Sequence, residues 1–378
     1  MNQLHNAQEK INNKRRRFLR TLPALTAGIA GLSGCSPAMK SSPVASQMGI
    51  KPLKKPDKST IEFRAGKTRY DILYDSLMPL QEQVAQEIVG KQVIIKVNCA
   101  LIDPQYQYCS TDADQLRAIL EFLKPICDTQ VIISEGTSSK ASTIMPAYDN
   151  YGYRPLEKNY NIKFVDSNDQ QTRAVYIHAA KQFPRKININ SMYMDANVYL
   201  ISAARMKTHN CVVATLSTKN VVMGSPQCRY WEKNKGRGIS DKPYMHGGEG
   251  LPDGDASGQE LSYNIFTVAL AGVRPDLTVI DGFQSVEGDG PWGGEVVEHG
   301  VAFASTDFVA ADRLGIELMG IDQFYMKYVE WCGDAGMGNF DLENIKVEGP
   351  DYRKYIRKYK LHSNVAQQTA WIDRNFTR

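Results

Sequence analysis

The chain has 378 residues, 42% of them hydrophobic and 23% charged, a balance that suits a globular protein with a sizeable core. Its formal charge of +4 is concentrated near the start, because residues 1–34 hold six of the 45 basic and one of the 41 acidic residues. The 39 basic and 40 acidic residues that follow carry a net charge of −1, which excludes the broad basic surface of a nucleic-acid-binding protein.

The first 34 residues have the pattern of an export signal. The sequence KRRRFLR at residues 14–20 resembles a twin-arginine signal, and the apolar run that follows it is too short to span a bilayer. Leu32–Cys35 (LSGC) resembles a lipoprotein signal-peptidase box, in which the cysteine sulfur takes the lipid. We therefore predict a signal peptide over residues 1–34, export by the twin-arginine machinery and lipidation at Cys35.

We expect the mature protein in the periplasm, anchored to a membrane by acyl chains rather than spanning it. Ser36 stands where lipoproteins retained at the inner membrane usually have aspartate, so we expect the outer membrane in a two-membrane bacterium. Residues 35–59 are rich in Ser, Pro and Lys and are predicted to form a tether. An α/β domain over 60–350 and a basic, aromatic C-terminal extension over 351–378 complete the predicted organisation.

Six cysteines follow Cys35, and none belongs to a CxxC pair, so the chain has no local iron–sulfur motif. Export permits disulfide bonds, and two pairings across loops are open: Cys99 with Cys109, and Cys211 with Cys228. The alternative is that these thiols are buried small hydrophobic groups.

Patterns of buried strands and amphipathic helices alternate along the chain. A strand, a helix and a second strand in this order imply a right-handed crossover and parallel pairing. The predicted fold class is therefore α/β, a mostly parallel sheet with helices on both faces. Strands are predicted at 93–98, 131–134, 162–165, 198–201, 277–280 and 301–304, and helices at 77–89, 111–124, 143–152, 261–272 and 306–319.

Residues 224–260 are rich in Gly, Lys, Asp and Pro and show no hydrophobic period. A loop of that length inside a compact domain is usually a functional lid or disordered. We interpret it as a glycine-rich lid insertion, in which glycines beside His246 permit close approach of the backbone to a ligand. We predict that His246 and His209 belong to one site; the alternative is that His246 is a surface residue.

Charged and polar side chains follow several of the predicted strands. Met206–Asn220 comes after the strand at 198–201 and includes Lys207, His209, Lys219 and Asn220. Open α/β sheets bind ligands beyond the carboxyl ends of their strands, so these side chains are candidates for a site. The same arrangement recurs at Lys96 and Asn98, at Glu135 and Gly136, and at Asp281. We expect the four groups to converge on one rim of the sheet.

Asp312 lies on the apolar face of the helix predicted at 306–319. A carboxylate that points toward the sheet needs a polar or charged partner, and we expect a lysine from the rim. Gly288–Gly294 (GDGPWGG) lacks both the context of a dinucleotide-binding loop and the GKS/T of a P-loop. We interpret it as a tight turn that brings the backbone near a ligand, or as a neighbouring loop.

Together these segments resemble the family known as domain of unknown function 362 (DUF362), over about Val93 to Gly349. Many members carry a ferredoxin-like segment with clustered cysteines, which this chain lacks. The resemblance implies the fold and a site at the rim, without implying a particular reaction. The matching pieces are IKVN at Ile95–Asn98, the acidic-capped helix at Thr111, SEG at Ser134–Gly136, KTH at Lys207–His209, TKN at Thr218–Asn220, DG at Asp281–Gly282, GDGPWGG at Gly288–Gly294 and STDFVAAD at Ser305–Asp312.

The leading hypothesis is an envelope enzyme that uses a bound metal or organic cofactor and acts on an anionic small molecule. An oxidoreductase is the first interpretation of its reaction, and a hydrolase is the second. Neutral imidazoles serve as metal ligands or acid–base groups, and lysines orient anions. The alternatives are a non-catalytic solute-binding lipoprotein and a scaffold whose polar rim is structural. The candidate catalytic residues are Lys207, His209, Lys219, Asn220, Asp281 and Asp312; the candidate ligands of a divalent metal are His209, His246 and Asp281; the candidate cofactor-binding residues are Lys96, Asn98, Glu135, Gly136, Gly288 and Gly290.

Overall fold

In the computed structural model, every described residue belongs to the unit of residues 41–378. The structure describes residues 49, 51–99, 101–137, 143–179, 184–228, 240–246 and 258–374. The predicted signal peptide, Cys35, most of the tether and much of the predicted lid lie outside these ranges. Among the described helices, none combines the length and the apolar character that crossing a bilayer requires.

The described part of the chain contains a mixed sheet of nine strands with a parallel centre, which confirms the predicted α/β class. Its order is β11-β1-β10-β9-β7-β2-β3-β4, and β8 pairs with β7. All neighbours from β9 to β4 are parallel, whereas β10 is antiparallel to both of its neighbours. The strands are β1 (Ser59–Ala65), β2 (Gln92–Lys96), β3 (Val131–Glu135), β4 (Ile162–Asp166), β7 (Val198–His209), β8 (Val213–Thr215), β9 (Leu277–Glu287), β10 (Glu295–Ser305) and β11 (Ile345–Glu348), with a separate hairpin of β5 (Thr172–Ile177) and β6 (Arg185–Asn190).

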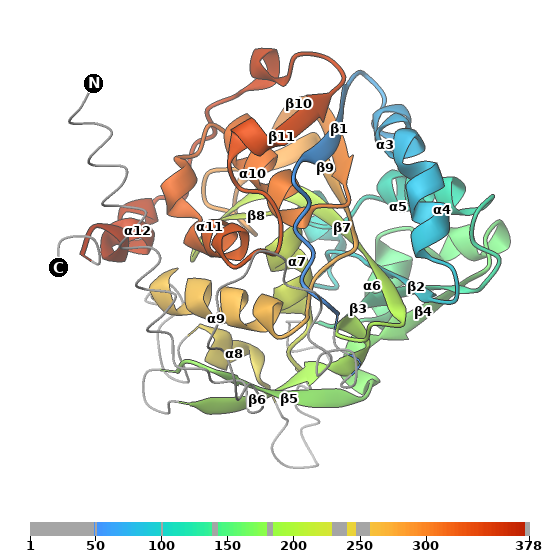
Figure 1. The fold of residues 1–378 in the computed structure, drawn as a ribbon, viewed down its shortest axis with the longest axis horizontal. Coiled ribbons are helices and arrows are strands. Elements are labelled where there is room, and N and C mark those ends of the chain that lie inside the picture. The colour runs from blue at the N-terminus through green and yellow to red at the C-terminus, as the bar shows by residue number, and fades with distance from the viewer. Residues whose placement is uncertain are drawn as a thin grey trace. The chain divides into compact units, whose positions relative to one another are not determined.

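Helices cover both faces of this sheet, as predicted (Figure 1). Side chains alternate along each strand, so Ile95 of β2 packs in one core and its neighbour Ile94 packs in the other. One face is covered by α3 (Arg69–Leu77), α4 (Gln81–Glu87), α5 (Ala113–Leu123) and α6 (Met145–Asn150), and the other by α7 (Ser217–Gly224), α9 (Gly258–Leu270), α10 (Phe308–Leu318) and α11 (Lys327–Asp334). The short α8 (Lys242–Met245) and the C-terminal α12 (Val365–Arg374) both contact α9.

Three strands, β7, β9 and β10, are longer than their apolar runs predict. The strand expected at 198–201 continues to His209, because β8 pairs antiparallel with its last three residues and β9 runs beside it. The strand expected at 277–280 continues to Glu287, because its second half forms a hairpin with β10. The glycine-rich stretch Gly288–Gly294 is the loop of that hairpin.

The helix expected at 77–89 is also different in the structure. Only α4 lies within it, and a short 3₁₀ turn at Met78–Leu80 separates α4 from the unpredicted helix α3. Pro79 lies in that turn and lacks the N–H that a continuous helix needs. The helix after Thr111 begins one residue later than its capping box predicts, because Asp112 is the N-cap and accepts from the Asp114 N–H.

The direction of the strand order reverses between β2 and β7. From β2 the chain proceeds outward to β3 and β4, and from β7 it proceeds outward to β9 on the other side. Lys96, the last residue of β2, lies opposite Ser202, so β7 extends seven residues beyond its neighbour to His209. Ligands of open α/β sheets bind outside the carboxyl ends of the strands at such a switch point.

Candidate functional site

A buried ion pair joins the ends of β2 and β3 at the switch point. Lys96 Nζ donates to Glu135 Oε2 at 2.7 Å and to Asn220 Oδ1 of α7 at 3.2 Å. Glu135 also accepts from the backbone N–H groups of Cys99 at 3.0 Å and Gly136 at 2.9 Å. Lys96 is 1% exposed and Glu135 is 2% exposed. Because their hydrogen-bonding groups are occupied by one another and by the chain, this pair holds the strand ends in place.

Lys207 extends the same network from β7. Its Nζ donates to Asn98 Oδ1 at 2.6 Å and to the Cys109 carbonyl, while Asn98 Nδ2 donates to Asn220 Oδ1 at 2.9 Å. The Trp292 ring of the glycine-rich hairpin loop has its centroid 5.6 Å from Lys207 Nζ. Burial lowers the pKa of Lys207 to about 8. Three of the four groups expected at the rim are therefore brought together.

Lys219 lies on α7 beside this network and differs from the other lysines. Its side chain is 7% exposed, and within the described residues no acceptor forms a hydrogen bond or ion pair with its Nζ. Burial, together with the charges of Lys207, Lys242 and Lys96, lowers the pKa of Lys219 to about 7. The ammonium form of Lys219 is thus held in a buried position without a counter-ion.

Lys242 of α8 adds a fourth buried cation. Its Nζ donates to the carbonyls of Gly136 at 3.0 Å and Thr137 at 3.3 Å. We define the lysine cluster as Lys96, Lys207, Lys219 and Lys242. Within the described ranges, the carboxylate that forms an ion pair with a member of this cluster is Glu135, which pairs with Lys96. Buried charges are costly unless they are paired, so three uncompensated ammonium groups favour an anion in the completed site.

Two neutral imidazoles accompany the cluster. His209 Nδ1 accepts from the Cys211 N–H at 3.0 Å, so its neutral ring carries the proton on Nε2. Burial lowers the pKa of His209 well below its usual value, and the charges of Lys219 and His246 contribute to this shift. Burial likewise lowers the pKa of His246 to about 4, with a contribution from Lys219. The two histidines expected to share a site thus lie within electrostatic range of each other and of Lys219.

The predicted metal site is not assembled by the described residues. Asp281 lies inside β9 instead of at its end, with Oδ2 3.1 Å from Arg69 Nε and 4.0 Å from Arg205 Nη2. Its Oδ1 accepts from the Phe283 N–H. In the ranges that the structure describes, no three His, Cys, Asp or Glu side chains are grouped to hold a metal ion. The set of His209, His246 and Asp281 is therefore wrong, because the hairpin extends β9 past Asp281 and two arginines engage its carboxylate.

Asp312 has a different partner from the one expected. It is fully buried, as predicted, but its carboxylate accepts from the backbone N–H groups of Ser217 at 2.7 Å and Thr218 at 2.9 Å. The lysine partner was wrong because α10 packs against the start of α7, whose first N–H groups lack partners within the helix. Burial raises the pKa of Asp312 to about 6. Asp312 caps α7 and so positions Lys219 and Asn220.

The glycine-rich hairpin loop packs against β7 next to Lys207. Thr208 Oγ1 donates to the Gly288 carbonyl at 2.9 Å. A Cβ at Gly290 would lie 2.5 Å from the Thr208 carbonyl oxygen, so only glycine permits this approach. At Gly136 a Cβ would lie 2.5 Å from Ser167 Oγ. These contacts fit the second interpretation of the glycine-rich hairpin loop, a loop that lies beside the site. A role of Gly288 and Gly290 in binding a cofactor stays a prediction.

Sequence reasoning missed the contribution of the C-terminal extension. Gln368 of α12 donates through Nε2 to the His209 carbonyl at 3.0 Å and accepts through Oε1 from the Val213 N–H at 2.7 Å. It therefore braces the turn between β7 and β8. The helical spacing of Val365, Gln368 and Ile372 is the signal that could have predicted α12. Lys242 lies in a stretch without hydrophobic period, so no pattern pointed to it.

Neither of the two disulfide pairings left open by the sequence forms. Cys99, Cys109, Cys211 and Cys228 are buried thiols outside any disulfide bond, which agrees with the alternative of small hydrophobic groups. Cys109 Sγ donates to the Pro291 carbonyl and so contacts the glycine-rich hairpin loop instead of a second thiol.

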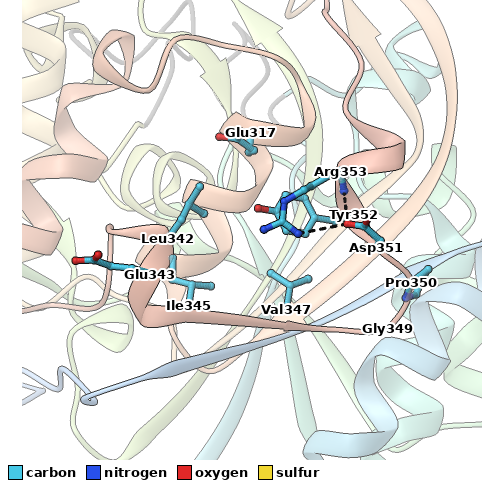
Figure 2. A pocket seen from close by; sticks show the side chains of 10 residues that line it. All are labelled: Glu317, Leu342, Glu343, Ile345, Val347, Gly349, Pro350, Asp351, Tyr352 and Arg353. Carbon is cyan, nitrogen blue, oxygen red and sulfur yellow. Dashed lines mark hydrogen bonds and ion pairs between the residues drawn. The ribbon is translucent and has the colours of Figure 1, made fainter.

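A separate hollow of about 670 Å³ lies at the other edge of the sheet, beside β11 (Figure 2). Its charged groups pair locally, as when Arg353 Nη1 donates to Asp351 Oδ1 at 3.4 Å, and both side chains are exposed. None of the residues predicted to be functional lines it. The hollow is formed by Glu317, Leu342, Glu343, Ile345, Val347, Gly349, Pro350, Asp351, Tyr352 and Arg353.

Comparison with known proteins identifies the family of this chain. The model of the family described as "Domain of unknown function (DUF362)" matches residues 93–317, which is more than half of the chain and includes β2, β7 and α7. The chain is 23% identical over 236 residues to the thylakoid-associated protein sll1697 of Synechocystis sp. (strain ATCC 27184 / PCC 6803 / Kazusa). That match covers 62% of this chain and 64% of the relative, so it spans less than two thirds of the relative's length. The chain therefore belongs to the DUF362 family.

Proposed function

We propose that this chain is an enzyme that binds a small anionic organic molecule at the switch point between β2 and β7. The observation that carries the proposal is the charge of the lysine cluster. Lys207, Lys219 and Lys242 are each less than 9% exposed, and no carboxylate of the described residues pairs with them. A carboxylate or sulfate-like group in this position would supply the missing negative charge and would accept hydrogen bonds from Lys219 Nζ.

The groups beside the anion favour an enzyme over a carrier. A binding protein needs the lysines, but it has no use for two imidazoles that burial keeps neutral. Neutral histidines, together with an amine whose pKa is about 7, can move protons at the pH of the cell envelope. A carrier would bind the anion and release it unchanged, so turnover of a bound organic anion separates the two functions.

Calorimetric titration with sulfate and with oxalate tests the binding step, since both anions stay fully ionised between pH 6 and pH 9. A hydrogen bond to a charged group contributes about 1.5–3 kcal/mol, so Lys219→Met should weaken binding by about 10- to 100-fold. Lys163→Met is the matched control, because Lys163 is exposed on the edge strand β4. Equal affinities of the wild type and of Lys219→Met for both anions would contradict the proposal.

We also propose that the protein is exported and lipid-anchored, on the pattern of residues 14–20 and Cys35. Cys35→Ser should leave the precursor unprocessed or release a form without acyl chains, as measured by labelling with radioactive palmitate and phase partition in detergent. Replacement of both Arg15 and Arg16 by lysine should block export. Acylation in the Cys35→Ser variant, or continued export of the double lysine variant, would show that these signals are not used.

A further inference from the structure

Lys219 is the member of the lysine cluster whose Nζ forms no hydrogen bond with a described residue. Lys96 Nζ donates to Glu135 and Asn220, Lys207 Nζ donates to Asn98, and Lys242 Nζ donates to two backbone carbonyls. Lys219 Nζ makes no such bond to any residue that the structure describes, although its side chain is more than nine-tenths buried. An amine at the end of a largely buried side chain, without a partner among the described residues, is available to a ligand.

The fold fixes the backbone that carries this nitrogen. Lys219 is the third residue of α7, and the Asp312 carboxylate binds the first two N–H groups of that helix. The next residue, Asn220, is anchored to β2 by Asn98 and Lys96. The local backbone is thus tied to buried polar groups on both sides of Lys219, which limits the positions that its amine can reach.

The surroundings also suit a nucleophilic amine. An amine attacks only in its neutral form, and desolvation or a neighbouring cation raises the neutral fraction at neutral pH. Lys219 has both, because it is buried and lies near Lys207, Lys242 and Lys96. The other three lysines are committed to acceptors of the protein, so they are less available for attack.

We propose that Lys219 forms an imine with the carbonyl carbon of a bound oxo acid, whose anionic group lies against the remaining lysines of the cluster. This inference rests on the proposed function, because it places the anion in the same site. It narrows the substrate class to small molecules that carry both a reactive carbonyl and a negative charge.

The atoms balance without an oxidant or a reductant. The Nζ lone pair attacks the carbonyl carbon, a C–N bond forms, and the carbonyl oxygen takes a proton to give a carbinolamine. The carbinolamine then loses its hydroxyl group and the last N–H proton as one molecule of water, which leaves the C=N bond.

Reductive trapping tests the inference on the full-length protein. The wild type is incubated at neutral pH with pyruvate, or with glycolaldehyde phosphate, in the presence of cyanoborohydride, and the labelled lysines are located by peptide mass mapping. We expect an adduct on the peptide that contains Lys219 with at least one of the probes, and loss of that adduct in Lys219→Arg. The two probes distinguish a carboxylate from a phosphate as the anionic group. Arginine retains the positive charge but cannot form the imine under these conditions.

The same samples are titrated with oxalate, so that the two proposals can fail separately. Both proposals are supported if Lys219→Arg still binds oxalate and only the wild type gives a trapped adduct. If adducts form only on exposed lysines such as Lys163 while oxalate binding still depends on the lysine cluster, the imine proposal is wrong and the anion-site proposal stands. If the wild type binds no oxalate or sulfate and traps neither probe, both proposals are overturned.

Discussion

Gly224→Ala is a change of one methyl group that tests how tightly the lysine cluster is built. Gly224 is the last residue of α7, and a Cβ at this position would lie 2.0 Å from Lys96 Cε and 2.6 Å from Lys96 Nζ. Ordinary van der Waals contact begins near 3.4 Å, so the Lys96 side chain would have to withdraw by about 1.4 Å. Such a displacement separates Lys96 Nζ from Glu135, which it contacts at 2.7 Å.

The expected loss of stability follows from these distances. Breaking a buried ion pair costs about 3–5 kcal/mol, because the carboxylate that remains is uncompensated. Alanine in place of glycine near the end of a helix recovers at most about 1 kcal/mol. We therefore expect Gly224→Ala to reduce the free energy of unfolding by about 2–4 kcal/mol, measured by urea denaturation followed by circular dichroism.

Gly293→Ala is the control for this prediction. A Cβ at Gly293 would lie 3.3 Å from the Asp289 carbonyl oxygen, a contact that small shifts can relieve, so we expect a change within about 0.5 kcal/mol. Lys96→Met in the Gly224→Ala background should add less destabilisation than it does in the wild type, because the pair is already broken. An unchanged unfolding free energy of Gly224→Ala would refute the account of a tightly packed, structural Lys96–Glu135 pair.

Three further predictions concern the groups that position or charge the site. The pKa of Asp312 is raised from 3.8 to about 6, so the folded state binds this proton more tightly than the unfolded state. The free energy of unfolding of the wild type should therefore fall by about 3 kcal/mol as the pH rises from 3.8 to 6. Urea denaturation at a series of pH values should show this dependence in the wild type and not in Asp312→Asn. Gln368→Ala should accelerate hydrogen exchange of the Val213 N–H through loss of its acceptor, whereas the exposed Gln367→Ala should leave it unchanged. Sulfate affinity should fall as pH rises through about 7 and then about 8, the pKa values of Lys219 and Lys207, and a flat profile would show that neither ammonium contacts the anion.

The sequence was sufficient for features that depend on local periodicity. Apolar runs placed the centres of β2 and β3 and the start of β7. The polar residues that follow these runs, Lys96, Glu135 and Lys207, meet at the switch point because parallel strands end on the same side of a sheet. The alternation of strands and helices was likewise enough to predict the α/β class and helices on both faces.

Features that depend on distant pairing could not be read in this way. Asp281 was expected at a strand end, but β9 continues past it because β10, more than ten residues later, pairs with it. The partner of Asp312 is the backbone of α7, and backbone N–H groups leave no signature in a sequence. Gln368 reaches the site only because α12 packs against α9, a contact between segments about 100 residues apart.

Anomalous diffraction from crystals soaked in selenate would test the central claim most directly, because selenate is a dianion whose position the selenium atom reveals. The account predicts an ordered selenate with an oxygen about 2.7–2.9 Å from Lys219 Nζ, the distance of a hydrogen bond between an ammonium group and an anion. It also predicts that this selenate is lost in crystals of Lys219→Met. Ordered selenate at exposed lysines alone, with Lys219 Nζ paired instead to a carboxylate of the protein, would contradict the claim that this cluster is an anion site.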